Sequence, residues 1–191
     1  MPKKNINKNL NDPRAEKSIR DIKRAMLEFI TAMTFEQIHV EQIIATAPVN
    51  KNTFYKYFAS KQDVLDAIRE DLLSEMRDKL NDENTKSMRE AVLIFYQMME
   101  RPESSFQKLF SDDKYSDFKK QLTYDYFASD FFKRFSPDSS YDDIVISYIG
   151  DAAVGIYNWW KKKKPTDRIA IEELAVLTEQ MLMNGLRSVE A

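Results

Sequence analysis

The chain has no cysteine and only one histidine, His39, among its 191 residues. The absence of cysteine rules out a disulfide framework and thiolate chemistry, and it fits residence in the cytosol. One histidine without cysteine provides neither a transition-metal ligand set nor a histidine-dependent catalytic triad. No glycine-rich phosphate loop is present either. The sequence therefore predicts no enzyme, no metal site and no cofactor.

Glycine, proline and long apolar runs are also scarce. Three glycines and six prolines, beside nine methionines and 31% charged residues, indicate a mostly helical protein, and no strand pattern is present. No apolar run approaches the roughly 20 residues that span a membrane, and there is no signal peptide. We therefore expect a cytoplasmic protein with no membrane partner.

The net charge of −2 conceals an uneven distribution. Residues 1–62 hold 11 Lys and Arg against 6 Asp and Glu, a charge of +5, so the remainder carries −7. A basic front on an acidic remainder is typical of a protein that places one end against a polyanion. Chance segregation of surface charge is the alternative, and charge alone does not distinguish the two.

Two short helical segments flank a proline in the basic front. Residues 40–47 carry apolar residues at helical spacing, and Pro48 ends that helix because the residue before a proline avoids helical dihedral angles. Asn50 is a good N-cap for a second helix over residues 51–58. A helix, a short turn and a second helix together form a helix-turn-helix.

The second of these helices has two different faces. Phe54 and Phe58 are four residues apart, so they share one face, which we expect to be buried. Asn52, Thr53 and Lys56 lie on the opposite face. Amide, methyl and ammonium groups of this kind read base edges in the major groove of DNA.

The stretch from Phe35 to Leu65 resembles the DNA-binding domain of TetR/AcrR-type transcriptional regulators. The resemblance rests on the recognition-helix sequence Thr53-Phe54-Tyr55-x-Tyr57-Phe58, followed by Lys61. It covers roughly residues 14–75. The Thr-Phe-Tyr variant with an asparagine N-cap is similar to a subgroup common in low-GC Gram-positive bacteria.

The resemblance implies roles for individual residues. Tyr55 and Lys61 would hold the sugar-phosphate backbone, and Tyr57 lies where some relatives also contact it. Lysines in this segment are either phosphate contacts or ordinary solvated side chains, and we favour phosphate contact. The candidate DNA-binding residues are His39, Asn50, Lys51, Asn52, Thr53, Tyr55, Lys56, Tyr57 and Lys61.

Two residues depart from the family pattern. His39 stands where the family usually has Thr or Ser capping the first helix of the motif, although a histidine can still donate to phosphate. Pro48 replaces the turn glycine common in the family. Because proline does not adopt positive φ, we expect this turn to be built differently.

The fold predicted for the whole chain is all-α, with about nine helices. A three-helix helix-turn-helix head precedes a C-terminal helical bundle for ligand binding and dimerisation. The predicted divisions are a mobile tail at 1–12, the head at 13–75 and the bundle at 76–191. In the bundle we expect helices at about 85–100, 103–111, 115–135, 139–163 and 170–188.

Seventeen of the 23 aromatic residues lie between positions 91 and 160. They form either an aromatic core alone or a core that also lines an effector pocket, since ligand cavities are largely apolar and aromatic. The candidate ligand-binding residues are Phe95, Tyr124, Phe127 and Tyr148.

The last two predicted helices carry apolar stripes of their own. In the family, these helices pair with their copies in a second subunit as a four-helix bundle, so the resemblance implies a homodimer. Packing within a single chain is the alternative. Taken together, we expect a ligand-responsive regulator, a repressor by the family's usual mode, that binds a pseudo-palindromic double-stranded DNA operator and responds to an unidentified small molecule. The alternative is a helical protein-interaction co-regulator with a weak or vestigial head.

Overall fold

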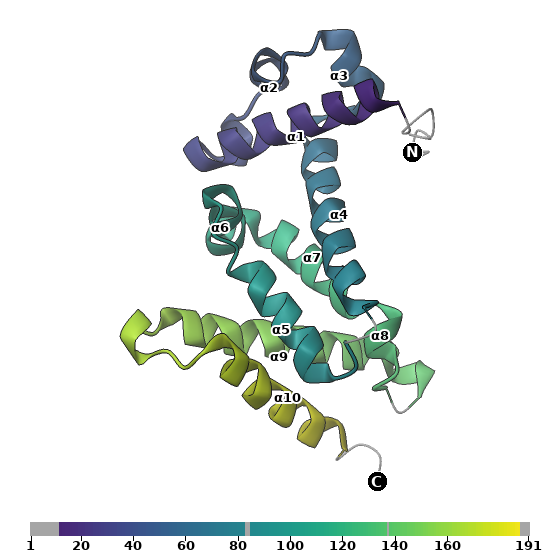
Figure 1. Cartoon of the computed structure of the whole chain (residues 1–191), viewed down its shortest axis with the longest axis vertical. Coiled ribbons are helices and arrows are strands. Elements are labelled where there is room, and N and C mark those ends of the chain that lie inside the picture. Colours follow the sequence, from purple (N-terminus) through teal and green to yellow (C-terminus); the bar gives the residue numbers. More distant parts are fainter. Residues whose placement is uncertain (1–11, 83–84, 137, 188–191) are drawn as a thin grey trace. The chain divides into compact units, whose positions relative to one another are not determined.

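The computed structural model describes residues 12–82, 85–136 and 138–187, and over those ranges the chain is helical (Figure 1). Ten α-helices and four short 3-10 turns make up its regular structure, and the described ranges contain no strand. The predicted all-α class is confirmed, with one helix more than expected. None of these helices is long and apolar enough to cross a membrane.

The chain divides into two compact units. We call the unit containing the chain up to Asp71 and Glu103–Ser116 the head, and the unit containing Leu72–Pro102 and the chain from Asp117 onward the body. The head holds α1 (Pro13–Ala32), α2 (Val40–Thr46), α3 (Lys51–Tyr57), the first part of α4 (Lys61–Leu80) and α6 (Ser104–Ser111). The body holds the rest of α4, with α5 (Met88–Met99), α7 (Ser116–Phe127), α8 (Asp130–Lys133), α9 (Asp142–Lys162) and α10 (Ile171–Arg187).

The head unit includes a segment that lies far along the sequence. α6 packs on α1, and the ammonium of Lys108 donates to the carbonyl of Met33 at 3.2 Å. The predicted head, residues 13–75, therefore does not contain all of this unit. The predicted tail lies outside the described residues except for Asp12, whose carboxylate caps α1 by accepting from the amide of Arg14 at 2.9 Å.

α1 buries the stripe that its helical spacing predicts. Ile22, Met26 and Ile30 have no exposed surface, while the stripe's other members are half-buried. The half-buried members are Ile19, Phe29 and Met33. Because these residues recur every three or four positions, they form an apolar face on one side of α1. α2 and α3 pack against α1.

The predicted start of α4 is confirmed in its hydrogen bonds. The amide of Asp63 donates to Ser60 Oγ at 3.2 Å, and the Asp63 carboxylate accepts from the amide of Ala59 at 2.8 Å. This reciprocal arrangement satisfies amides that have no partner inside the helix. It fixes the residue at which α4 begins and hence the place of Lys61 in its first turn.

The body is built around an aromatic core. Tyr96, Tyr126 and Phe132 have no exposed surface, and their neighbours Phe95 and Phe127 are equally buried. The Phe95 ring lies 5.7 Å from Tyr126 and 5.0 Å from Phe127, measured between centroids. α10 packs along both α5 and α9, which closes the bundle around these rings.

The prediction of one continuous helix over residues 115–135 is wrong, because the structure has two helices there. α7 ends at Phe127 and α8 begins at Asp130. Phe127 and Phe132 would lie about 140° apart around a continuous helix, and only one of them would face the core. The break at Ser129 brings both rings inside, with their centroids 4.7 Å apart.

Candidate nucleic-acid interface

α3 turns its phenylalanines into the head. Phe54 has no exposed surface and Phe58 is 5% exposed, with ring centroids 6.0 Å apart. A helix of seven residues is too short to be stable alone in water. These two rings anchor it, because burying each one contributes on the order of 2 kcal/mol.

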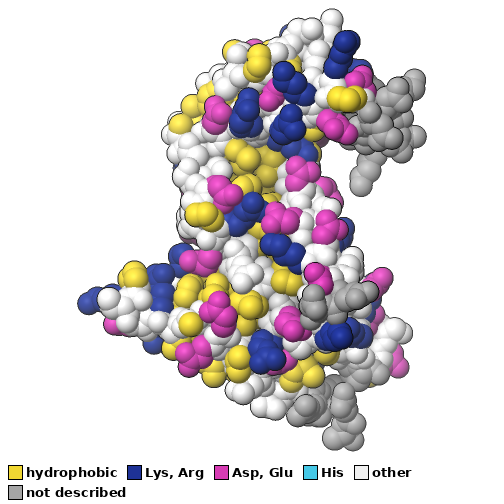
Figure 2. Space-filling model, in the orientation of Figure 1, with side chains coloured by type: hydrophobic (Ala, Val, Ile, Leu, Met, Phe, Trp, Pro, Cys, Tyr) yellow, Lys and Arg dark blue, Asp and Glu magenta, His cyan; other side chains and the backbone are white. Residues whose placement is uncertain are grey.

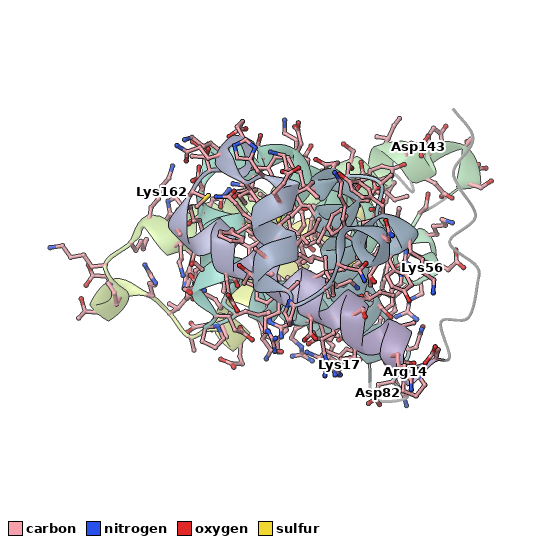
Figure 3. The ribbon with its side chains drawn as sticks, turned by 90° about the horizontal axis from the view of Figure 1, so that it is seen from above. Arg14, Lys17, Lys56, Asp82, Asp143 and Lys162 are labelled. Carbon is pink, nitrogen blue, oxygen red and sulfur yellow. The ribbon has the colours of Figure 1, made fainter. Side chains whose placement is uncertain are left out.

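The rest of α3 faces outward. Lys51, Asn52, Tyr55 and Lys56 are exposed, and Thr53 is half-buried. Figure 3 shows Lys56 at the surface of the protein. The predicted division of this helix into an apolar inner face and a polar outer face is confirmed, and its outer face offers amide, hydroxyl and ammonium groups to a partner.

Each exposed lysine of α3 lies beside a tyrosine ring. Lys51 Nζ is 6.0 Å from the ring centre of Tyr55, and Lys56 Nζ is 5.1 Å from that of Tyr57. Exposed cation–π pairs contribute about 0.5–1 kcal/mol, enough to favour one side-chain orientation without fixing it. No acidic group lies within ion-pair distance of either lysine across 12–82, 85–136 and 138–187. Both ammonium groups therefore remain available to an anion.

Asn50 is the N-cap of α3, as predicted. Its side-chain oxygen accepts a hydrogen bond from the amide of Thr53 at 2.7 Å. The side-chain oxygen of Asn50 is therefore already engaged within the helix. A DNA contact by Asn50 would therefore use its amide nitrogen.

The turn between α2 and α3 overturns one expectation. We expected Pro48 to avoid positive φ, but its φ is 22°, the one positive value outside glycine among the residues the structure describes. The pyrrolidine ring favours a φ near −65°, so this conformation is strained. Ala47 and Phe54, which are both buried, hold the chain on either side of the turn.

His39 is the N-cap residue of α2, and its side chain is exposed. Its backbone amide donates to Gln42 Oε1 at 2.7 Å, so Gln42 closes the first turn of α2. The imidazole lies at the surface beside the start of the helix. The position agrees with the predicted phosphate contact, which stays a prediction.

Lys61 is arranged differently from the expectation drawn from family resemblance. Its ammonium donates to the carbonyl oxygens of Phe35 at 2.6 Å, Ile38 at 2.8 Å and Glu36 at 3.2 Å. An ammonium has three N–H groups, and here each has an acceptor within the protein. The structure therefore gives no support to a direct phosphate contact by Lys61. Sequence reasoning missed this cluster because backbone carbonyls leave no mark in the sequence.

Basic side chains outside α3 also reach the surface of the head. Arg14, Lys17 and Arg20 are exposed along the first half of α1, and Figure 3 labels the first two. Lys23 is paired with Asp71 at 2.6 Å and Arg24 with Asp21 at 3.1 Å, so those charges are already neutralised. Lys and Arg side chains are visible on the head in Figure 2. Arg14, Lys17 and Arg20 form no ion pair with the residues that the structure describes, so they add positive charge to that of α3.

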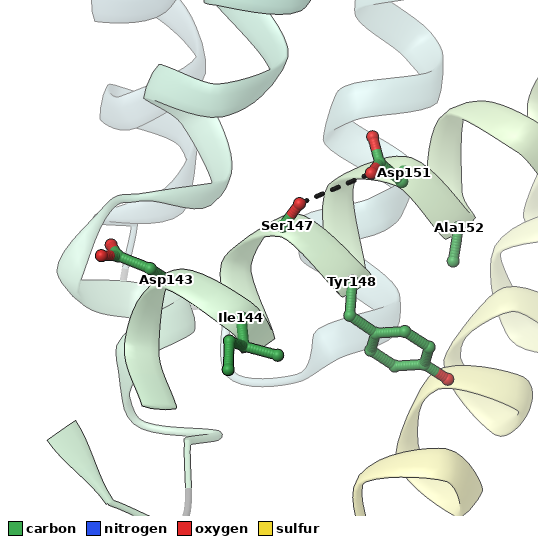
Figure 4. Close-up of a pocket in the computed structure, with 6 residues that line it drawn as sticks. All are labelled: Asp143, Ile144, Ser147, Tyr148, Asp151 and Ala152. Atoms are coloured by element: carbon green, nitrogen blue, oxygen red, sulfur yellow. Dashed lines mark hydrogen bonds between the residues drawn. The ribbon is translucent and has the colours of Figure 1, made fainter. Parts of the chain in front are cut away.

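The four candidate ligand-binding residues differ in burial. Phe95 and Phe127 belong to the aromatic core, whereas Tyr124 and Tyr148 are 49% and 40% exposed. Tyr148 borders an open depression of about 520 Å³ whose lining residues all come from α9 (Figure 4). A depression lined by a single helix is a groove on the protein surface. A role for these four residues in binding an effector stays a prediction.

The body offers no metal site among the residues the structure describes, since no group of three His, Asp or Glu residues is placed to hold an ion.

Comparisons with known proteins agree with this geometry. A model of the family "bacterial regulatory proteins, tetR family" matches residues 31–68. No curated protein matches the sequence. A solved TetR transcriptional regulator from Streptococcus agalactiae 2603V is similar, with a TM-score of 0.66 and 17% identity over 91% of this chain and 97% of that one. The dihydroxyacetone kinase operon activator DhaS has a TM-score of 0.58 and 19% identity over 90% of this chain and 97% of its own.

At such identities the likeness to solved structures shows a shared fold, and the family match adds the identity of the head. Residues 31–68 run from the end of α1 into α4 and contain every candidate DNA-binding residue named above. Residues 31–68 thus match the bacterial regulatory proteins of the tetR family, and the chain as a whole shares the fold of two solved proteins, one of them a TetR transcriptional regulator.

Proposed function

We propose that the protein is a repressor that binds a pseudo-palindromic operator as a homodimer and is released by a small-molecule effector. The single observation that carries the DNA-binding part is the division of α3. Its phenyl rings are buried, while Lys51, Asn52 and Lys56 are exposed, and neither lysine pairs with an acidic group of the described part of the chain. Such a helix fits the major groove, where Asn reads adenine and Lys reads guanine.

The body supports the dimer. Large apolar side chains are exposed on α9 and α10, with Ile144 at 68%, Trp159 at 60% and Met181 at 62%. Leu177 and Tyr148 add 44% and 40% exposure on the same two helices. Several large apolar groups exposed on two helices indicate a surface for a partner, and the same surface on a second copy would form a two-fold interface.

The charge pattern of α9 favours antiparallel pairing with its own copy. Asp143 lies at its start and Lys162 at its end, both exposed, and Figure 3 labels both. Ala152 stands midway, and a β-carbon added to Gly155 would meet nothing within 4 Å. Small residues at the centre allow two helices to approach closely, and opposite charges at the ends then face each other.

In this arrangement two recognition helices enter successive major grooves, about 34–36 Å apart along one face of the duplex. α4 contributes to both the head and the body, so it connects an effector site in the body to DNA binding. An effector shifts the equilibrium only by its differential affinity for the two states. The proposal does not depend on Phe95, Tyr124, Phe127 and Tyr148 forming the effector site.

The DNA-binding proposal is tested by selecting binding sites from random double-stranded DNA and measuring affinity against salt. We expect paired, inverted half-sites and an affinity that falls steeply as salt rises. Asn52→Ala should relax base preference at one position per half-site, and Lys56→Ala should weaken binding with a smaller salt slope. Lys120→Ala, which removes an exposed lysine from α7 in the body, is the matched control and should leave both unchanged.

The rival function, a protein-interaction co-regulator with a vestigial head, predicts weak binding that hardly depends on salt. The regulatory mode needs a separate measurement, because one solved relative is named an operon activator. A reporter gene behind the selected site should be silenced when the protein is present. Increased transcription from that reporter would reject repression and leave the DNA-binding proposal standing.

A further inference from the structure

The ammonium of Lys61 joins the first turn of α4 to the chain that leads into α2. Its three acceptors, Phe35, Glu36 and Ile38, lie in or directly after the 3-10 turn Phe35–Gln37. Lys61 Nζ also lies 4.6 Å from the ring centre of Phe35. Carbonyl oxygens at the end of a helical turn carry partial negative charge and keep a lone pair free even where, as at Phe35, they accept one backbone bond, so together they form a site for a cation.

The segment held by Lys61 determines where the helix-turn-helix begins. Ile38 has no exposed surface, and the next residue, His39, caps α2. The side chains of Gln37 and Gln42 accept from the amides of Thr34 and His39 at 3.0 and 2.7 Å. Those two bonds hold the amides at either end of this segment. The Phe35 carbonyl also accepts from the amide of Ile38 at 3.2 Å, while Lys61 supplies a donor to the carbonyls of Glu36 and Ile38 as well.

Moving Lys61 to a phosphate would leave three carbonyls without this donor, two of them in part-buried bonds. Hydrogen bonds that involve a charged group are stronger than neutral ones. Exchanging these three bonds for a phosphate contact would therefore lower the free energy little. We propose that Lys61 is a positioning residue for DNA binding, which acts by fixing the 35–38 segment and the start of α2 rather than by contacting DNA. The proposal rests on the DNA-binding function proposed above.

The choice of lysine follows from the geometry. A compact ammonium on a flexible stem directs three donors toward converging acceptors, whereas the guanidinium of arginine is a planar fork. Arginine satisfies a phosphate at least as well as lysine does but does not reproduce this carbonyl cluster. Lys61→Arg therefore separates the two roles while keeping the charge.

The test uses the full chain and measures binding to a double-stranded DNA duplex by fluorescence anisotropy over a series of salt concentrations. The variants are Lys61→Met, Lys61→Arg and, as a matched control, Lys56→Met. All measurements are made well below the unfolding temperature of each variant, so that a merely structural loss of stability does not lower affinity. Amide hydrogen exchange of residues 38–43 is followed in the same proteins.

We expect Lys56→Met to lower the slope of log affinity against log salt by about 1, because it removes one positive charge that the proposed binding mode places against the duplex. Lys61→Met and Lys61→Arg should keep the wild-type slope, weaken binding about tenfold at every salt concentration and speed exchange at residues 38–43. If Lys61→Met lowers the slope by about 1 while Lys61→Arg binds as the wild type does, Lys61 contacts phosphate and the inference is overturned. If the wild type itself shows no salt-dependent binding, it is the proposed DNA-binding function that fails.

Discussion

The hydroxyl oxygens of Tyr96 and Thr178 lie 2.8 Å apart in the body, where neither side chain has any exposed surface. Thr178 Oγ1 also lies 2.8 Å from the carbonyl of Leu174, and Tyr96 Oη lies 3.2 Å from that of Ala153. The pair thus links α5, α9 and α10 through polar groups that have no access to water. Polar groups buried in this way are costly when one partner is removed.

The first prediction is that Tyr96→Phe and Thr178→Val each lower the free energy of unfolding by about 1–2 kcal/mol. The double variant should lose less than the sum, with a coupling of about 1 kcal/mol, because both changes remove the same bond. Urea unfolding of the four proteins measures the cycle. Strictly additive losses would show that the two hydroxyls do not interact.

The second prediction concerns alkaline pH. Burial raises the pKa of Tyr96 to about 12 and raises the pKa of Tyr126 as well. Tyrosines in the unfolded chain ionise near pH 10, so above that pH the unfolded state binds fewer protons than the folded one. The contribution of these tyrosines to stability should therefore be constant below about pH 10 and be lost as the pH rises toward 12.

Thermal unfolding at increasing pH, with tyrosinate absorbance followed alongside, tests this loss. In Tyr96→Phe the dependence on pH should be shallower, since one of the buried hydroxyls is gone. An unfolding temperature that stays level to pH 12 in the wild type would contradict the raised pKa values.

Structural features that depend on residue spacing within one helix were predicted correctly from the sequence. The four-residue spacing of Phe54 and Phe58 decides which side of α3 is buried, and no distant contact alters that result. The break between α7 and α8 was not predicted because it follows from tertiary packing. Phe127 and Phe132 are both buried in the core, and helical periodicity does not show that the two rings pack against each other.

Functional residues were harder to predict where their partners are backbone atoms or distant helices. The acceptors of Lys61 lie 23–26 residues upstream and are carbonyls, which every residue has. Phe95 and Tyr148 differ in burial although both are aromatic members of helical stripes, because the difference depends on which neighbour covers each face. Contact of α3 with DNA remains a prediction.

The third prediction addresses the strained turn. Glycine tolerates positive φ far better than proline does, so Pro48→Gly should relieve much of a strain of about 1–3 kcal/mol. The added freedom of the unfolded chain offsets about 0.4–1 kcal/mol of that gain. The variant should therefore unfold at a slightly higher temperature than the wild type. Pro48→Ala serves as the comparison. It also removes the pyrrolidine ring, but alanine still disfavours positive φ, so its unfolding temperature should rise less than that of Pro48→Gly. A lower unfolding temperature for Pro48→Gly would mean that the proline is unstrained.

The last prediction tests the antiparallel pairing of α9 through its terminal charges. In the proposed dimer, Asp143 of one copy faces position 162 of the other. Lys162→Asp therefore places like charges at both ends of the interface and should weaken dimerisation about five- to tenfold. Asp143→Lys should do the same for the opposite reason. The double variant Asp143→Lys/Lys162→Asp restores both attractions and should dimerise nearly as well as the wild type. Lys120→Asp makes an equal change of charge on α7 and controls for net charge.

Sedimentation equilibrium at low salt measures all five proteins, because exposed charge pairs are screened as salt rises. Rescue in the double variant is the informative result, since a general effect of charge on the body predicts no recovery. If the double variant is as weak as the singles, the two ends of α9 do not meet across the dimer, and the helices pair in another register. If every variant dimerises like the wild type, the apolar residues Ile144, Trp159 and Met181 hold the interface without help from these charges.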